Sequence, residues 1–434
     1  MNELNARLLD FIRRSPTALH VSANAAAELA AAGYTELNEC ADWQLCPGGR
    51  YFVRRNSSAL IAFALPADCA RTHFQIFAAH TDSPALRVKT AWKLEDKLYL
   101  RLNAETYGGG LWGTWSDRPL SVAGRVGVRT ENGVRMQLVN IDRDLLMLPS
   151  VPIHFNREAN NGVKIDPQAD LCPVLTMDTS LTLEQLLAEE LGCAAEDILS
   201  HELMVYCRSQ GFCWGAREEF LSCPRLDDAA CCFAGLAALL ESGDAGRSIR
   251  MLACMDNEEC GSTTRQGAVG TFLIDTLERI GEALGWSRSR LLAAQAGSYM
   301  LSADNAHAVH PAHGELYDAA NRTAMNGGVV LKHAVAYSTS GESDGILRAL
   351  CKKHGLPLQD FANRSNIRGG STLANIATTH LNIRMADIGL PQLAMHASFE
   401  TMGAKDLSDM VELARHYFGE TLTVAAEGDY RWEA

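Results

Sequence analysis

The sequence lacks the features of two large classes of protein. It has no run of five or more basic residues, and its 39 Lys and Arg stand against 52 Asp and Glu, which gives a net charge of −13. An acidic balance weakens attraction to nucleic-acid phosphates and to anionic lipids. The longest nearly continuous apolar stretch, residues 229–240, is well short of the ~20 residues needed to cross a bilayer. We therefore expect no nucleic-acid partner and no membrane partner.

The sequence also lacks the spacing of a metal-binding or redox cysteine motif. Its 13 cysteines, an odd number, are scattered and include no Cys-x-x-Cys pair. The first residues form an amphipathic helical pattern without the apolar core of an export signal. We expect reduced thiols and a cytoplasmic location.

The pattern along the chain predicts an α/β fold. The 434 residues are 47% hydrophobic and 21% charged, which is typical of a folded chain of one large or two ordinary domains. Strands and helices alternate in both flanking parts, which indicates a mixed, largely parallel sheet flanked by helices. Residues 91–223 instead contain short strand-like pieces. We predict a discontinuous domain of residues 1–90 and 224–434 with a β-rich domain, 91–223, inserted in it.

Several element boundaries can be predicted. A helix over 183–191 should begin with a capping box of Thr182 and Gln185. The expected strands of the α/β part lie near 58–64, 74–79, 249–255, 298–303, 329–332 and 381–386. The expected helices lie near 228–240, 268–284, 343–354 and 403–418.

Polar residues that suit a metal site follow the ends of several predicted strands, where ligand sites of open α/β sheets lie. Each alone is typical of a helix cap or a solvated turn, and Asp227 with Asp228 is typical of a helix N-terminus. Together they supply the imidazoles and carboxylates that a paired-metal hydrolase needs for two cations and a general base. The candidates are His80, Asp82, Asp227, Asp256, Glu258, Glu259, Asp304 and His396.

In such a site seven of these candidates would each have one role, and Asp256 would have none. His80 and His396 would bind different metals, Asp304 and Glu259 would be the terminal carboxylates, and Asp227 would bridge. Glu258 would be the general base. Asp82 would hydrogen-bond the second ring nitrogen of His80 and fix its tautomer.

A competing signal is the Gly-x-Ser-x-Gly pattern of residues 341–345, which resembles a serine nucleophile elbow. A true elbow places its serine directly between a strand and a helix, whereas the nearest predicted strand ends at Lys332. We predict that Ser343 is a helix cap.

Six motifs, in order, make the sequence similar to the aspartyl aminopeptidase family of di-zinc metallo-aminopeptidases, which also contains the vacuolar leucine-preferring aminopeptidase. They are His80-Thr81-Asp82-Ser83-Pro84 with Leu86-Arg87-Val88-Lys89, Tyr107-Gly108-Gly109-Gly110-Leu111-Trp112 with Trp115 and Asp117-Arg118, Arg225-Leu226-Asp227, Asp256-Asn257-Glu258-Glu259 with Gly261-Ser262, Ser302-Ala303-Asp304 with residues 306–311, and residues 391–396.

The resemblance implies an enzyme that removes the N-terminal residue of short peptides. It implies two zinc ions per subunit, with manganese or cobalt as substitutes. One zinc would be bound by His80, Asp227 and Asp304, and the other by Asp227, Glu259 and His396. Glu258 would be the base, with Asp82 behind His80.

The resemblance further implies a homo-oligomer. The inserted domain would be the dimerisation domain, and dimers would assemble into a tetrahedral dodecamer with enclosed active sites. His154 matches a family histidine that reaches the neighbouring subunit's active site, and the less favoured alternative is a packed interface histidine.

The predicted substrate pocket departs from the family pattern. Lys332 is matched, but Tyr337 follows at a shorter spacing, and the glycine loop around Gly370 also differs. An acidic N-terminal residue would need a cation, for which Lys332 is the candidate and Arg368 the substitute. Without such a cation, neutral or apolar residues would be preferred.

Two other functions remain open from the sequence. The same two-metal core occurs in carboxypeptidases and amidases, which would need a cation for a free carboxylate. A catalytically inactive scaffold is disfavoured because the ligand set and the base are intact. The native metal, the physiological peptide and an assembly that stops at the dimer are left undecided.

Overall fold

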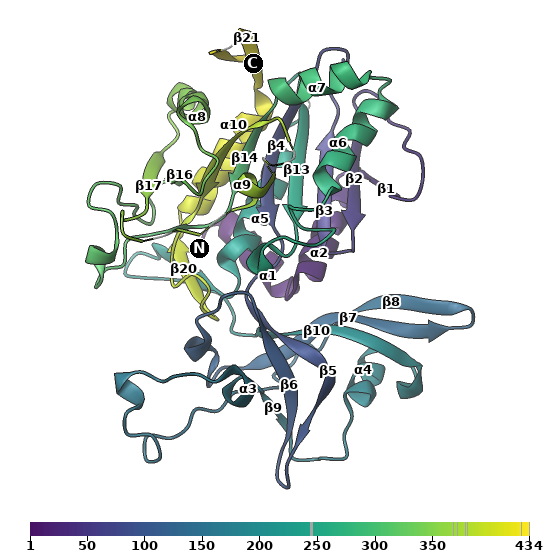
Figure 1. The fold of residues 1–434 in the computed structure, drawn as a ribbon, viewed down its shortest axis with the longest axis vertical. Coiled ribbons are helices and arrows are strands. Elements are labelled where there is room, and N and C mark those ends of the chain that lie inside the picture. The colour runs from purple at the N-terminus through teal and green to yellow at the C-terminus, as the bar shows by residue number, and fades with distance from the viewer. Residues whose placement is uncertain are drawn as a thin grey trace.

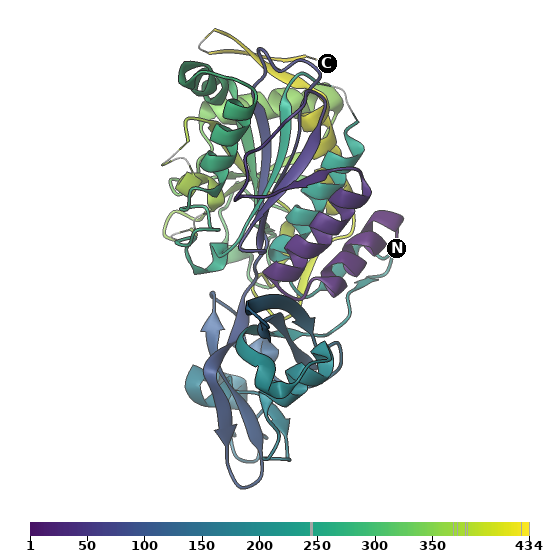
Figure 2. The ribbon, with the colours of Figure 1, turned by 90° about the vertical axis from the view of Figure 1, so that its right-hand side faces the viewer.

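The computed structural model describes residues 1–243, 246–367, 369–370, 372–377, 379, 381–426 and 428–433. The chain forms an α/β part and, below it in Figures 1 and 2, a separate β-rich part. This agrees with the predicted fold class. Among the helices of the described residues, none has both the length and the apolar character of a bilayer span.

A mixed nine-stranded sheet forms the centre of the α/β part (Figure 1). Its middle strands β13, β4, β14 and β18 are parallel to one another, and β3 and β16 run antiparallel to them. In spatial order the strands are β1 (Thr35–Leu37), β2 (Arg50–Arg55), β3 (Ala59–Ala64), β13 (Ile249–Met255), β4 (Phe74–His80), β14 (Tyr299–Ala303), β18 (Arg384–Gly389), β16 (Val329–His333) and β17 (Leu358–Ala362).

Helices cover both faces of this sheet because alternate residues of its buried strands point to opposite sides. Leu252 and Cys254 pack into one core, whereas Met251 and Ala253 pack into the other. The first core includes side chains of α1 (Glu3–Arg14), α2 (Ala18–Ala31), α5 (Leu226–Glu241), α8 (Gly341–His354) and α10 (Asp406–Gly419). The second includes α6 (Phe272–Ala283), α7 (Arg288–Gly297) and α9 (Leu373–Ala377).

The β-rich part is an antiparallel six-stranded sheet with its own apolar core. Its strands, in spatial order, are β8 (Gly133–Asn140), β7 (Leu120–Thr130), β10 (Ile198–Cys207), β5 (Ala85–Glu95), β6 (Leu100–Tyr107) and β9 (Val174–Thr176). Helices α3 (Pro167–Asp170) and α4 (Leu183–Leu191) belong to the same part, and the capping box of Thr182 and Gln185 is present.

This sheet does not coincide with the predicted insertion of residues 91–223. It begins at Ala85, and its last strand ends at Cys207. The segment that follows joins a five-stranded sheet with strands from the C-terminal half of the chain. That sheet has the order β11 (Phe212–Trp214), β12 (Phe220–Cys223), β20 (Glu400–Gly403), β19 (Pro391–Leu393) and β15 (Ala306–His307).

Some boundaries differ from the sequence predictions. The predicted strand over 381–386 lies at 384–389, and the helix predicted from residue 403 begins at Asp406 because residues 400–403 form β20. The predictions contained neither α7 nor the terminal hairpin of β21 (Thr421–Ala426) and β22 (Asp429–Glu433).

Candidate metal centre

The parallel middle strands bring the predicted ligands to one edge of the sheet. His80 is the last residue of β4, and Asp304 directly follows the neighbouring strand β14. Glu258 and Glu259 lie in a short 3-10 turn after β13, the neighbour of β4 on its other side. The carboxyl ends of these strands therefore place three separate segments of the chain around one point.

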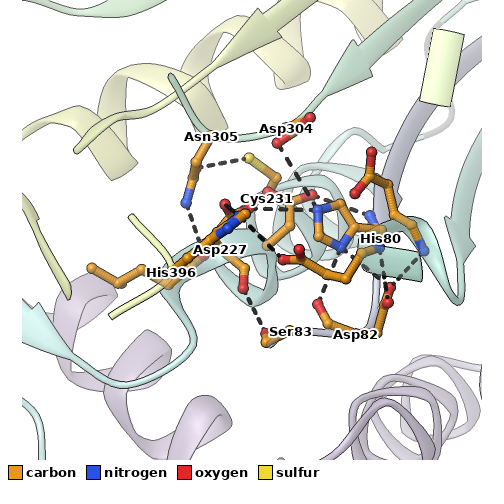
Figure 3. A network of polar contacts seen from close by, with 12 residues as sticks. His80, Asp82, Ser83, Asp227, Cys231, Asp304, Asn305 and His396 are labelled. Carbon is orange, nitrogen blue, oxygen red and sulfur yellow. Dashed lines mark hydrogen bonds and ion pairs between the residues drawn. The ribbon is translucent and has the colours of Figure 1, made fainter. Parts of the chain in front are cut away.

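Two further segments complete the cluster (Figure 3). Asp227 lies at the start of α5, where its backbone and that of Asp228 are not yet helical, so the regular helix follows both residues. His396 lies in the connection between β19 and β20 with a left-handed φ of 66°. The alternative interpretation, an ordinary helix N-terminus at Asp227, does not describe this segment, which turns both carboxylates into the cluster.

The carboxylate of Asp227 lies between the two histidines. Its Oδ1 is 3.5 Å from Nε2 of His80, and its Oδ2 is 3.4 Å from Nε2 of His396. Asp304 Oδ1 lies 3.9 Å from the same His80 nitrogen, and Glu259 Oε1 lies 3.4 Å from that of His396. The arrangement therefore forms two donor groups that share Asp227. The first group is His80, Asp227, Asp228 and Asp304, and the second is Asp227, Glu259 and His396.

The cluster carries more negative charge than its protein partners neutralise. Three of its buried carboxylate oxygens, on Asp227, Asp228 and Glu259, have no hydrogen-bond partner. Burial disfavours a charged His396, yet Asp227 and Glu259 raise its pKa to about 10. Burial also opposes protonation of His80, but Asp228 and Asp227 raise its pKa well above the ordinary value. A site with such an excess of acid favours a bound cation.

Hydrogen bonds to the second ring nitrogen fix the orientation of each histidine. Nδ1 of His80 lies 3.1 Å from the backbone carbonyl of Asp82 and 3.4 Å from its carboxylate. Nδ1 of His396 donates to the carbonyl of Gly109 at 2.8 Å. In both rings Nε2 then faces the carboxylates, which is the arrangement expected for a metal-binding imidazole. The predicted contact between Asp82 and His80 is thus present, with the backbone carbonyl as the nearer acceptor.

The comparisons with known proteins fit this geometry. The sequence model of a family described as "Aminopeptidase I zinc metalloprotease (M18)" matches residues 11–418. The chain belongs to this family. A relative from Clostridium acetobutylicum, named a probable M18 family aminopeptidase 2, is 41% identical over 415 residues, which are 93% of this chain and 96% of the relative.

Solved structures of similar fold were also found. The chain in a cryo-EM structure of the Ape4 and Nbr1 complex has a TM-score of 0.93 and 33% identity, over 96% of this chain and 85% of that one. A structure titled as the mApe1 dodecamer of S. cerevesiae has a TM-score of 0.83 over 96% of each chain. Its identity is 24%, so this second likeness concerns the fold.

Membership of the M18 family makes the protein a hydrolase, a zinc metallo-aminopeptidase. The carboxypeptidase, amidase and scaffold hypotheses are therefore set aside. The nucleophile-elbow pattern has a structural explanation in this M18 protein. Ser340 is the N-cap of α8, and Ser343, the third residue of the helix, forms a capping box with it. The prediction that Ser343 itself is the cap was thus wrong by three positions.

The predicted pocket residues lie in different environments. Lys332 is buried, and its Nζ is 3.6 Å from Asp304 Oδ2 and 5.7 Å from the ring centre of half-buried Tyr337. Gly370 is exposed, with no atom within 4 Å of the position a Cβ would occupy. His154 is exposed, and among the described residues no hydrogen bond or ion pair joins it to the cluster. Arg368 lies outside the described residues.

Two residues at this cluster were missed by the sequence predictions. Asp228 accepts a hydrogen bond from the backbone amide of His80 at 3.1 Å and belongs to the first donor group. Glu400 is buried and accepts hydrogen bonds from the amides of Asp227, at 3.0 Å, and His396, at 2.6 Å. Asp228 could have been found as the neighbour of Asp227, whereas no local signal distinguishes Glu400.

Proposed function

We propose that this M18 enzyme removes N-terminal residues from short peptides with two zinc ions per subunit. His80, Asp227 and Asp304 would bind one ion, and Asp227, Glu259 and His396 the other. The observation that supports this most strongly is the position of Asp227, whose two carboxylate oxygens face different histidines. Imidazole nitrogens and carboxylate oxygens suit zinc, and the three buried carboxylate oxygens that accept no hydrogen bond fit a bound cation.

The bound zinc would supply Lewis-acid polarisation of the scissile carbonyl and lower the pKa of water toward ~7. The side chains of the protein would do the rest. Glu258, adjacent to Glu259 but in neither donor group, would accept the proton of the attacking water and transfer it to the leaving amine. Burial is the main cause that raises the pKa of Glu258, and the charges of Asp304 and Asp82 raise it further, whereas His80 lowers it. The resulting pKa of about 7 suits a general base at neutral pH.

For the substrate we propose a preference for N-terminal Asp or Glu, with Lys332 as the cation and Tyr337 and Gly370 in the pocket wall. Burial opposes the charge of Lys332, but Asp304 raises its pKa, so the ammonium stays protonated. The ion pair between Lys332 and Asp304 also supports a second candidate for the substrate preference. If Asp304 holds the ammonium in place, Lys332 cannot turn to a substrate carboxylate, and neutral or apolar residues would be cleaved faster.

We also propose that the β-rich part dimerises, that His154 serves the neighbouring active site, and that dimers form a dodecamer. Val134, Met136 and Leu138 support an interface because these apolar side chains are 56%, 49% and 40% exposed on the edge strand β8. The solved mApe1 dodecamer has the same fold. Enclosed active sites would restrict substrates to short peptides.

The test measures release of the first residue from matched peptides that begin with Asp, Glu, Leu, Ala or Lys. Each is assayed before chelation, after chelation and after the return of zinc, with zinc counted per subunit. We expect activity that is lost on chelation, regained at two zinc ions, and fastest with Asp and Glu. Full activity at one zinc ion per subunit would contradict the shared-ligand site. A Leu or Ala preference would retain the mechanism and reject the role of Lys332.

A further inference from the structure

The end of β6, a strand of the six-stranded sheet, contacts the candidate metal centre of the α/β part. The hydroxyl of Tyr107, the last residue of β6, donates to Asp82 Oδ2 at 2.7 Å. The side-chain amide of Asn257 donates to the same hydroxyl at 2.8 Å. The hydroxyl is therefore held from both sides, and its proton points to Asp82.

Asp82 carries this contact to the acidic turn. Its Oδ1 accepts the backbone amide of Glu258 at 3.1 Å, and its Oδ2 accepts that of Glu259 at 3.2 Å. These two amides belong to the residues proposed as general base and zinc ligand. One buried carboxylate thus accepts the backbone amides of both residues.

The glycines after Tyr107 bring the same segment against the other ligands. Gly108 has a φ of +74°, and a Cβ there would lie 3.1 Å from the Cβ of Glu259. The carbonyl of Gly109 accepts Nδ1 of His396, and the amide of Leu111 donates to the carbonyl of His396 at 2.8 Å. The segment therefore forms one wall of the centre.

From these contacts we propose that Tyr107 is a positioning residue for Glu258: its hydroxyl orients Asp82, which holds the turn that carries the base. The inserted sheet then contributes to the position of the base, in addition to any role in assembly. This inference rests on the proposed function.

The proposal predicts a specific kinetic effect. Burial and the charge of Asp82 raise the pKa of Tyr107, so the hydroxyl keeps the proton that it donates. A hydrogen bond to a charged group is among the stronger ones in proteins, and its loss would shift Glu258 without removing a substrate contact. Tyr107→Phe should therefore lower kcat about tenfold and change KM by less than about twofold.

Tyr206→Phe is the matched control. Tyr206 lies in the same sheet, is 5% exposed, and donates from its hydroxyl to Asn140 Oδ1 at 2.7 Å, away from Asp82. We expect both variants to keep wild-type zinc content and the control to keep wild-type kcat. An unchanged kcat in Tyr107→Phe, or an equal loss in the control, would overturn the proposal.

A double-mutant cycle with Asp82→Asn tests the route. If Tyr107 acts through Asp82, the loss in the double variant should equal that of Asp82→Asn alone; losses that multiply would refute this route.

Gly108→Ala should lower kcat further than Gly192→Ala, since Gly192 also has a positive φ but no atom within 4 Å of a Cβ. If wild-type activity resists chelation, the proposed function fails; if it is chelator-sensitive and Tyr107→Phe is normal, only this inference fails.

Discussion

Glu258 and Glu259 are neighbours in the chain but lie in different surroundings. Glu259 is 3.4 Å from His396 and belongs to a donor group, whereas Glu258 belongs to none. We predict that Glu258→Gln keeps both zinc ions and loses activity by about 10²–10⁴-fold, because a neutral amide cannot accept the proton. Zinc analysis and turnover check this. Glu259→Gln is the control and should lose zinc. Turnover retained by Glu258→Gln would place the base elsewhere.

Lys332 can bind an acidic side chain of the substrate, hold Asp304 in place, or do both. Replacement by methionine removes its charge and keeps most of its apolar volume. If Lys332 binds an acidic side chain, kcat/KM should fall about tenfold more for peptides that begin with Asp or Glu than for those that begin with Leu. Parallel rates on the matched peptides measure this ratio. Equal losses, together with a lower zinc content, would restrict Lys332 to its ion pair with Asp304.

At the scale of elements, substitutions at the start of α8 should lower the stability of the protein without lowering its turnover. The hydroxyl of Ser340 accepts the amide of Ser343 at 3.2 Å, and the hydroxyl of Ser343 accepts the amide of Ser340 at 2.9 Å. Ser340→Ala should destabilise the protein by about 1 kcal/mol through loss of the cap. A thermal melt measures this change. Ser343→Ala should also melt earlier but keep full turnover, and its inactivity would revive the nucleophile hypothesis.

The elements of both parts were predictable where the pattern is local. The strand at 249–255 is a continuous apolar run, and the helix at 183–191 has its capping box in the sequence. Strand β20 was missed because residues 400–403 are paired on one side with β12, which is far away in the sequence, and on the other with the short strand β19. Likewise, β1 depends on its parallel partner β2.

The same distinction applies to the candidate site. Residues that end parallel strands, such as His80 and Asp304, could be predicted to meet because the strands align their carboxyl ends. The bonds of Glu400 to the amides of Asp227 and His396 depend on tertiary structure, and nothing in the local sequence encodes them. The roles of these residues in binding and catalysis stay predictions.

At the scale of the whole molecule, the role of His154 can be tested by complementation. A heterodimer of a His154→Ala subunit and a Glu258→Gln subunit has one active site with an intact base and an intact partner histidine. If His154 serves the neighbouring subunit, the isolated heterodimer should recover about half of the wild-type rate, since one of its two symmetry-related sites is complete. Activity is measured after sequential purification on two different tags. A heterodimer as inactive as either parent would place His154 in the active site of its own subunit, and full activity of the His154→Ala homodimer would place it outside catalysis.

One connection between the parts of the molecule lies beside the metal centre. Only Ser83 and Pro84 separate Asp82 from β5, whereas the returning chain leaves β10 at Cys207 and passes through β11 and β12 before it reaches Asp227. Replacing the β-rich part with a linker would therefore change the chain directly beside Asp82 at one end and farther from the cluster at the other. Engineers who seek a minimal catalytic core should keep residues 82–85 unchanged and place any new junction on the return side, between β10 and β11.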